Sequence, residues 1–492
     1  MVSIGARRPI MRLVDLLKGV KHEIKGNPNV DISGVCYDSR KAKPKYLFIA
    51  IKGFKTDGLL YVEEAIKNGA VAVVTDRDIS EYPGVTVVLV EDARAAMAKI
   101  ASNFYNNPTS KLTLIGITGT NGKTSVTYML KAILEQQNNK VGLVGTIQNM
   151  IGDRVIPTTH TTPESLDLQE LFSLMVNEGV KYVVMEVSSH SLALHRVDSC
   201  DFDIAVFTNL SQDHLDFHES MEEYAKTKSK LFKMAKKASV INIDDKYSSM
   251  MIESSKGKVL TYGIKDFAYV MAKEIKNSLS GVKFKVQIQD KKEEISLKIP
   301  GLFSVYNALA AITVADFLGI PLRSVREALS HVTVKGRFEP VETGRDFYVF
   351  IDYAHTPDGI RNIMEALKEY EAGRKILVFG AGGDRDKSKR PLMGEVAGKY
   401  ADFCILTSDN PRSENPKEII AQIEEGIKKT NCPYVVIEDR REAIRYALSN
   451  AQKDDVIILA GKGHETYQII GDKVIPFDER EIVKEILAES EK

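Results

Sequence analysis

The feature that most constrains the fold is a succession of short apolar runs, most of them separated by helix-length segments. From residue 111 onward these runs read KLTLIGIT, KVGLVGT, KYVVMEVSS, FDIAVFTNL and KKASVINI. A second series begins near residue 340, with DFYVFIDYA, RKILVFGAGG, DFCILTSD, PYVVIED and DDVIILAGKG. Continuous apolar strands that alternate with helices are typical of parallel sheets covered on both faces. The chain is therefore expected to be an α/β protein.

The chain has 492 residues, more than one hydrophobic core usually serves, which indicates about three domains. Residues 1–110 mix short apolar runs with helical stretches and are expected to form a small α/β domain that ends at the helix- and strand-breaking stretch YNNPTSK. A central domain with a mostly parallel sheet is expected at 111–337, with an antiparallel edge where residues 268–300 alternate polar and apolar. We expect a Rossmann-like, doubly wound domain at 338–492, whose tail VKEILAESEK forms a surface helix.

Composition excludes several classes of function. The 67 basic residues balance 67 acidic ones, so the chain has no general electrostatic footprint for nucleic acid. The four cysteines are far apart and form no CxxC pair, as expected for free thiols in a reducing compartment. No apolar run is long enough to span a bilayer, and the first residues do not resemble a signal peptide. A cytoplasmic protein without membrane insertion is expected.

The stretch GITGTNGKTS, residues 116–125, nearly matches a phosphate-binding loop. An apolar strand, a glycine turn and a helix start follow one another, which directs backbone N–H groups and the positive helix end at an anion. Lys123 would then reach the β and γ phosphates, and the hydroxyl of Thr124 would bind Mg²⁺. The usual G-x-x-x-x-G-K-[ST] pattern has its first glycine where this chain has Ile117. A glycine-rich turn needs no ligand, but the Lys-Thr pair favours a nucleotide.

Another glycine-rich stretch, GAGGDR at residues 380–385, only superficially resembles a dinucleotide fingerprint. Its third required glycine is replaced by Arg385, whose side chain prevents close packing of helix on strand. We therefore reject a nicotinamide cofactor. An Asp- and Arg-rich loop after a strand is better suited to holding a charged small molecule.

Acidic and histidine side chains gather in two loops that follow apolar strands. EVSSH places Glu186 at the sheet edge that faces the expected phosphates, and TNLSQDHLDFH presents Asn209, Asp213 and His214. Hard oxygen ligands of this kind suit Mg²⁺. His214 and His218, four residues apart, form an alternative zinc pair, although the chain has no HExxH motif.

The loop SDNPRSENP, residues 408–416, follows a strand and contains two prolines. Arg412 can clamp a carboxylate with its planar guanidinium, and Asp409 can accept hydrogen bonds from an ammonium group. This combination suits an amino-acid zwitterion. A plain helix N-cap before KEIIAQIEEG explains the same residues equally well.

These motifs together resemble the Mur ligase family, ATP-dependent enzymes that add amino acids to the peptidoglycan precursor. Further matches are TTP at 161–163, YNALAA at 306–311, GRFE at 336–339, DYAHTPD at 352–358 and GKGHE at 461–465. The best match within the family is to the members that add the third residue of the stem peptide. DNPR is typical of those that use meso-diaminopimelate, and lysine-adding members usually differ there. The resemblance implies phosphorylation of the D-Glu γ-carboxylate of UDP-MurNAc-L-Ala-D-Glu to an acyl phosphate, which the incoming amine attacks.

The resemblance also assigns residues to four groups. The expected ATP contacts are Gly119, Thr120, Asn121, Gly122, Lys123, Thr124, Ser125, Asn307, Arg337, Asp352 and His355. The expected Mg²⁺ ligands are Thr124, Glu186, His214 and a carbamoylated Lys228, and the catalytic set is Lys123, Glu186, His214 and Lys228. The UDP-linked substrate is expected on Ser39, Thr161, Thr162, Ser188 and Arg196. Diaminopimelate is expected on Arg390, Asp409, Asn410, Pro411, Arg412, Gly461 and Glu465.

Alternatives to this assignment remain open. The family pattern is not followed at His160, where Asn is frequent, or at Leu194, where Gln often contacts substrate. L-lysine is an alternative amino acid, and a folylpolyglutamate synthetase or a ligase of another Mur step is an alternative enzyme. A catalytically silent nucleotide-binding regulator is an alternative from another class. The protein is expected to act as a monomer.

Overall fold

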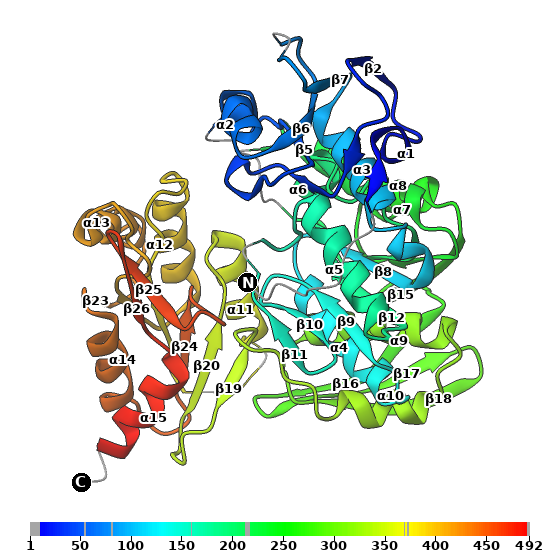
Figure 1. The fold of residues 1–492 in the computed structure, drawn as a ribbon. Coiled ribbons are helices and arrows are strands. Elements are labelled where there is room, and N and C mark those ends of the chain that lie inside the picture. Colours follow the sequence, from blue (N-terminus) through cyan, green and yellow to red (C-terminus); the bar gives the residue numbers. More distant parts are fainter. Residues whose placement is uncertain are drawn as a thin grey trace.

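The computed structural model describes residues 10–53, 56–79, 82–158, 160–211, 217–368, 370 and 373–489. Three main sheets follow one another along the chain, and the expected α/β architecture is confirmed. Figure 1 shows the N-terminal unit in blue at the top, the central unit in cyan and green at the right, and the C-terminal unit in yellow to red at the left. No helix in the described ranges has the length and apolarity needed to cross a membrane.

The N-terminal unit contains a five-stranded sheet in which only β2 runs antiparallel to its neighbour. In sheet order the strands are β2 (His22–Lys25), β7 (Thr86–Val90), β6 (Ala70–Thr75), β5 (Tyr46–Ile49) and β4 (Gly34–Cys36). A short pair, β1 (Met11–Arg12) with β3 (Asp31–Ile32), lies beside it. The helices are α1 (Leu13–Leu16), α2 (Val62–Lys67) and α3 (Ala93–Phe104).

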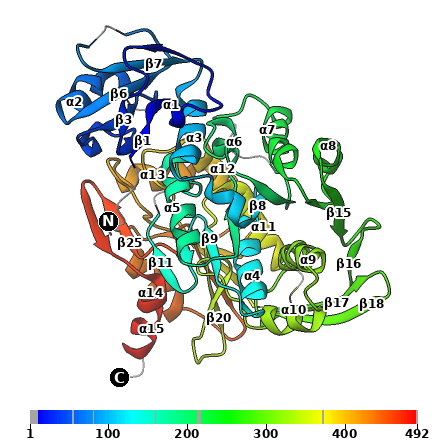
Figure 2. The same cartoon turned by 45° about the vertical axis from the view of Figure 1, so that its right-hand side comes forward.

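The central unit contains an eleven-stranded sheet. Its strands in order are β11 (Arg154–Ile156), β10 (Asn149–Ile151), β9 (Val141–Val144), β12 (Tyr182–Glu186), β8 (Thr113–Thr118), β13 (Phe202–Phe207), β14 (Ala238–Asn242), β15 (Lys258–Gly263), β16 (Val270–Ser278), β17 (Gly281–Ile288) and β18 (Lys291–Leu297). Strands β9 to β16 in this order are parallel, and β16 to β18 form the predicted antiparallel edge. Figure 2, like Figure 1, places β17 and β18 at the edge of the molecule away from the red C-terminal strands.

Helices cover both faces of the central sheet. The helices are α4 (Lys123–Glu135), α5 (Ser165–Asn177), α6 (Ser189–Ala193), α7 (Met221–Met234), α8 (Ser248–Ser254), α9 (Leu302–Phe317) and α10 (Leu322–Leu329). Successive side chains of β8 point to opposite faces, as strand geometry requires. Ile115 joins a cluster with α4 and α9, whereas Leu114 joins one with α5 and α7. This sandwich explains why the strands are apolar throughout.

The C-terminal unit contains a six-stranded sheet that is parallel except at one edge. Its strands in order are β19 (Glu339–Val341), β20 (Tyr348–Asp352), β24 (Val456–Ala460), β21 (Lys375–Phe379), β22 (Phe403–Leu406) and β23 (Tyr434–Val436). The helices are α11 (Pro357–Ala366), α12 (Lys389–Tyr400), α13 (Pro416–Ile427), α14 (Arg440–Ser449) and α15 (Glu479–Glu489). A separate hairpin joins β25 (Tyr467–Ile470) to β26 (Lys473–Pro476).

The doubly wound arrangement predicted for the C-terminal unit is present. Side chains of α11, α12 and α13 pack on one face of its sheet, and those of α14 and α15 pack on the other. The tail helix α15 begins earlier than the predicted stretch VKEILAESEK and is more than a surface helix, because Ile482, Val483 and Ile486 are buried. We propose 1–110, 111–337 and 338–492 as the domain bounds, since each main sheet lies within one of these ranges.

Candidate active site

A glycine turn at residues 119–122 connects β8 to the N-terminus of α4. Gly119 has φ +146°, and a Cβ there would lie 1.9 Å from the hydroxyl of Thr208. Gly122 has φ +85°, and its Cβ would lie 2.3 Å from Oδ1 of Asn307, the α9 residue predicted to contact ATP. Both positions therefore require glycine. Ile117 is a fully buried residue of β8, so the turn begins only after the position where the common motif has its first glycine.

The segment after β13 holds this turn in place. The hydroxyl of Thr208 donates to the carbonyl of Asn121 at 2.6 Å. The backbone N–H of Thr120 donates to the carbonyl of Asn209 at 2.8 Å, and that of Asn121 donates to the Asn209 side chain at 3.1 Å. The phosphate contacts of Thr120 and Asn121 stay predictions. At the start of α4, Lys123, Thr124 and Ser125 lie at the positive end of the helix dipole.

Two lysines converge on the turn. The ammonium of Lys123 donates to the carbonyls of Gly119 and Thr120 at 2.8 and 2.7 Å. The ammonium of Lys228, from α7, donates to the same Gly119 carbonyl at 2.9 Å and lies 4.6 Å from the ring centre of Tyr224. Lys228 is only 1% exposed. Two cations on one carbonyl oxygen repel each other, most strongly where water is excluded, and this arrangement suits a polyanion.

A buried carboxylate and hydroxyl from neighbouring elements fit the predicted Mg²⁺. Glu186 ends β12 and accepts hydrogen bonds from the backbone N–H and hydroxyl of Thr146, both at 2.9 Å. Thr124 is buried at the start of α4. One or two protein oxygens completed by phosphate oxygens and water are what Mg²⁺ prefers. His214 and Asp213 lie outside the described residues, and the described residues contain no cluster of three acidic, histidine or cysteine side chains suited to a metal.

Four of the five residues predicted to bind the UDP-linked substrate lie close together in the central unit, where hydrogen bonds connect the segment at 161–162 to Ser188 and Arg196. The hydroxyl of Thr161 meets that of Thr146 at 3.0 Å, and the hydroxyl of Thr162 donates to the carbonyl of Glu186 at 2.9 Å. Arg196 donates to the carbonyl of Thr162 at 3.0 Å, and the backbone N–H of Ser188 donates to the Thr162 hydroxyl at 3.3 Å. The fifth residue, Ser39, lies in the N-terminal unit, where its hydroxyl donates to Glu64.

The linker between the central and C-terminal units lies against the nucleotide loop. Arg337 stacks on the ring of Tyr353, with its guanidinium carbon 4.8 Å from the ring centre, and one of its amino groups lies 3.4 Å from the hydroxyl of Thr124. Asp352 accepts from the backbone N–H groups of Phe338 and Ala354 at 2.6 and 2.8 Å, which fixes the linker to β20. Burial raises the pKa of Asp352, and the charge of Arg337 opposes that shift. The ATP contacts predicted for Arg337 and Asp352 stay predictions.

The same linker contacts the GKGHE segment, residues 461–465, through backbone atoms at Gly336. Gly336 has φ +65°, and a Cβ there would lie 2.1 Å from the backbone nitrogen of His464. Gly463 has φ +54°, and its Cβ would lie 2.6 Å from Cβ of Tyr353. Two glycines thus permit the linker and the GKGHE segment to approach closely.

A cavity of about 880 Å³ opens between the central and C-terminal units. His190 contributes from α6, and His355 contributes from the loop after β20. The predicted amino-acid residues in its wall are Asp409, Asn410, Arg412, Gly461 and Glu465. The wall also includes Arg385 and Lys389, which follow the strand β21 and were not assigned individually from the sequence. Acidic and basic side chains therefore face one cavity.

Arg390 and Pro411 do not line that cavity. Arg390 is fully buried, and its guanidinium donates to both carboxylate oxygens of Glu414 at 2.9 Å and to Gln422 at 2.7 Å. The guanidinium of Arg390 holds the pKa of Glu414 at about 2. Arg412 has φ +51°, and its guanidinium donates to the carbonyl of Gly383 at 2.7 Å. The contact of Arg390 with an amino acid stays a prediction.

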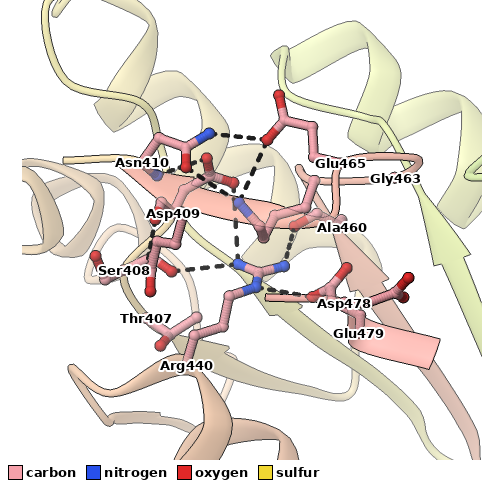
Figure 3. Close-up of polar contacts among 12 residues, drawn as sticks. Thr407, Ser408, Asp409, Asn410, Arg440, Ala460, Gly463, Glu465, Asp478 and Glu479 are labelled. Carbon is pink, nitrogen blue, oxygen red and sulfur yellow. Dashed lines mark hydrogen bonds and ion pairs between the residues drawn. The ribbon is translucent and has the colours of Figure 1, made fainter. Parts of the chain in front are cut away.

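A buried charge network underlies the cavity wall and was not predicted from the sequence (Figure 3). Arg440 and Glu479 are both fully buried and form an ion pair at 2.8 Å. Arg440 also donates to the carbonyl of Ala460, which ends β24, at 2.8 Å and to that of Ser408, which follows β22, at 3.4 Å; these two strands lie on either side of β21. Because EDRREAIRY is an ordinary charged helical stretch, nothing in its pattern distinguishes Arg440 from the arginines beside it.

His464 makes stability depend on pH. Burial, followed by the charge of Arg337, lowers the pKa of His464 from 6.5 to about 4. Between these values the unfolded chain binds a proton that the folded chain does not, so stability is lost as pH falls. We expect His464→Gln to remove about 2 kcal/mol of the difference in unfolding free energy between pH 7 and pH 5. Urea unfolding of both proteins at the two pH values measures this, and an unchanged difference would contradict it.

Comparisons with known proteins agree with this geometry. Three family models match the chain: "Mur ligase family, catalytic domain" at 31–105, "Mur ligase middle domain" at 117–315 and "Mur ligase, glutamate ligase domain" at 336–463. A relative from Alkaliphilus metalliredigens is 49% identical over 97% of this chain and 98% of its own length. Another from Clostridium acetobutylicum is 50% identical over 97% of this chain and 100% of its own. The first is named UDP-N-acetylmuramoyl-L-alanyl-D-glutamate--2,6-diaminopimelate ligase, and the second has the same name followed by the number 1.

Solved structures with a similar fold include a Mur ligase and a folylpolyglutamate synthase. A structure named as a UDP-N-acetylmuramoyl-L-alanyl-D-glutamate--2,6-diaminopimelate ligase is 31% identical, has a TM-score of 0.71, and the match covers 98% of this chain and 100% of that one. A folylpolyglutamate synthase from Mycobacterium tuberculosis, solved with ADP, is 19% identical with a TM-score of 0.63 over 75% of this chain and 91% of that one. The second likeness shows a common fold alone.

Proposed function

The chain belongs to the Mur ligase family, and on that premise we propose that it is an ATP-dependent amide ligase. It joins meso-diaminopimelate to the γ-carboxylate of D-Glu in UDP-MurNAc-L-Ala-D-Glu. The observation that carries the proposal is the cavity in which Asp409, Arg412 and Glu465 face the same space. Tyr353 in its wall stacks on Arg337, which reaches Thr124 of the nucleotide loop. The name shared by near-full-length relatives supports the same substrates.

The nucleotide loop serves to make a carboxylate reactive. A free carboxylate is a poor electrophile because its negative charge must be overcome. Transfer of the γ-phosphoryl group of ATP to the D-Glu carboxylate gives an acyl phosphate, the amine adds to its carbonyl carbon, and phosphate leaves as the amide forms. Lys123 is positioned to neutralise charge on the transferring group, and catalysis rests mainly on positioning and electrostatics.

Thr124 and Glu186 would hold Mg²⁺, together with His214 and a carbamoylated Lys228. When bound, the ion supplies charge neutralisation at phosphate oxygens. Carbamoylation forms a bond between the neutral amine of Lys228 and the carbon of CO₂ and releases a proton. It replaces a cation by an oxygen-rich anion. The burial of Lys228 on the carbonyl that Lys123 also contacts supports this modification, because removing one of two adjacent positive charges relieves their repulsion.

Recognition of diaminopimelate requires groups for a second zwitterionic centre, which lysine lacks. Arg412 offers a guanidinium to the distal carboxylate. Asp409 and Glu465 offer carboxylates to the ammonium group. Burial raises the pKa of Glu465, and the charge of Lys462 opposes that shift. A wall with both charge signs favours diaminopimelate over lysine.

An amino-acid panel tests the proposal. The purified protein is incubated with ATP, Mg²⁺, UDP-MurNAc-L-Ala-D-Glu and one of meso-diaminopimelate, L-lysine or L-ornithine, and phosphate release and product mass are measured. We expect product with diaminopimelate far in excess of the others. Product with lysine alone would reverse the specificity, and glutamate addition to folate alone would identify a folylpolyglutamate synthetase. Absence of substrate-dependent phosphate release would identify a silent regulator.

We further propose that the protein acts as a monomer in the cytoplasm. The central and C-terminal units of one chain together line the cavity, so the proposed reaction needs no residue from a second copy there. Sedimentation of the purified protein with and without ATP tests the oligomeric state.

A further inference from the structure

We propose that Lys462 is a positioning residue for the amino-acid substrate, which acts by fixing Asn410 and Glu465 from beneath the cavity wall. The inference rests on the proposed function, because it concerns the same cavity. Lys462 lies in the GKGHE segment, between two glycines with positive φ. This backbone turns the lysine side chain away from the cavity, so that it is fully buried and does not line the space.

The ammonium of Lys462 closes a triangle of polar contacts. It donates to Oδ1 of Asn410 at 3.1 Å and to Oε2 of Glu465 at 3.3 Å. The amide nitrogen of Asn410 donates to the same Oε2 of Glu465 at 2.8 Å. Figure 3 shows Asn410 and Glu465 directed toward each other above the Arg440 pair. Each of the three groups therefore fixes the orientation of the other two.

Asn410 is held from a second side as well. Its Oδ1 also accepts the backbone N–H of Ile469, in β25, at 3.0 Å. With both acceptor contacts on Oδ1, the amide nitrogen must face Glu465 and the cavity side of the triangle. Without the lysine, the Asn410 amide loses one of its three contacts, and Glu465 loses the ammonium that pairs with it.

The surroundings of Lys462 confirm that it is enclosed. Its ammonium lies 5.9 Å from the ring centre of Tyr467 and 5.8 Å from that of Phe477. A fully buried ammonium is costly unless it is paired and hydrogen-bonded. A lysine confined in this way has one orientation, so its hydrogen bonds hold the side chains of Asn410 and Glu465 in fixed positions in the cavity wall.

The test uses the full-length protein and two variants, Lys462→Gln and Lys462→Met. Both remove the charge, and methionine also removes every donor while keeping an unbranched, apolar side chain that a buried site tolerates. We expect KM for diaminopimelate to rise roughly 10- to 100-fold in each, as for the loss of a charged hydrogen bond. KM for ATP and for the UDP-linked substrate should stay near wild type. Lys473→Gln, at an exposed position of β26, is the matched control and should behave as wild type.

A double-mutant cycle separates positioning from general damage. If Lys462 acts through Glu465, Lys462→Gln should add little to the rise in KM caused by Glu465→Gln. Equal rises in KM for all substrates, or multiplicative effects in the double variant, would overturn the inference. So would a wild-type KM in either Lys462 variant. Failure of the proposed function is distinguishable, because the wild-type protein itself would then form no product from diaminopimelate.

Discussion

Replacing Lys123 with methionine is expected to lower kcat for amide formation on the order of 10²- to 10³-fold, as for loss of one preorganised charge-stabilising donor. Lys123 contacts two carbonyls of the glycine turn at 2.8 and 2.7 Å, so its ammonium is fixed where the helix N-terminus points. Methionine keeps much of the volume and removes the charge. Single-turnover phosphate release, measured with saturating diaminopimelate and UDP-linked substrate, separates this effect from weaker ATP binding.

The control is Lys111→Met, which removes an exposed lysine just before β8. It should leave kcat unchanged. Retention of the wild-type rate by the Lys123 variant would show that the turn does not hold the transferred phosphoryl group, and the proposed mechanism would then be wrong.

Replacing Glu479 with glutamine is expected to lower the free energy of unfolding by about 3–5 kcal/mol, the range for breaking a buried ion pair. Arg440 and Glu479 are both fully buried and 2.8 Å apart, so the variant removes the nearer carboxylate from a buried guanidinium and leaves the longer 4.0 Å contact with Asp409 as its remaining ion pair in the described part of the chain. Urea unfolding followed by circular dichroism measures the change.

Two further variants make the interpretation specific. Glu481→Gln, on the same helix but exposed and paired with the exposed Lys484, should change stability little. Arg440→Leu combined with Glu479→Leu removes both charges and should cost less than Glu479→Gln alone. A smaller effect of Glu479→Gln than of the surface control would show that α15 does not depend on this pair.

The sheets were predictable because their strands carry a local signal. KYVVMEVSS and RKILVFGAGG are apolar along their whole length, and this pattern follows from burial of both faces of a parallel sheet. The ends of the elements depend on tertiary contacts. Helix α15 begins at Glu479, before the predicted stretch VKEILAESEK, because a buried ion pair with α14 stabilises its first residue.

Site residues could be predicted where they lie next to one another in the sequence, within a single turn or loop. Gly119, Gly122 and Lys123 lie in one turn, and Asp409 to Arg412 lie in one loop, so sequence spacing reflects their geometry. Arg390 shows the limit. From the sequence it is one cation among several in GGDRDKSKRP. Only the fold shows that Arg390 is buried and forms an ion pair with Glu414. Lys462 could have been suspected from its flanking glycines, but the direction of its side chain could not.

The backbone contact between Gly336 and the GKGHE segment has a mechanical consequence. Gly336 is also held from the other side, since the backbone N–H of Tyr353, in the loop after β20, donates to the carbonyl of Gly336 at 2.9 Å. At this contact the linker and the GKGHE segment meet through backbone atoms, so no side chain can move aside to make room for a larger residue. A side chain added at Gly336 would therefore displace the GKGHE segment, and with it Glu465 in the cavity wall.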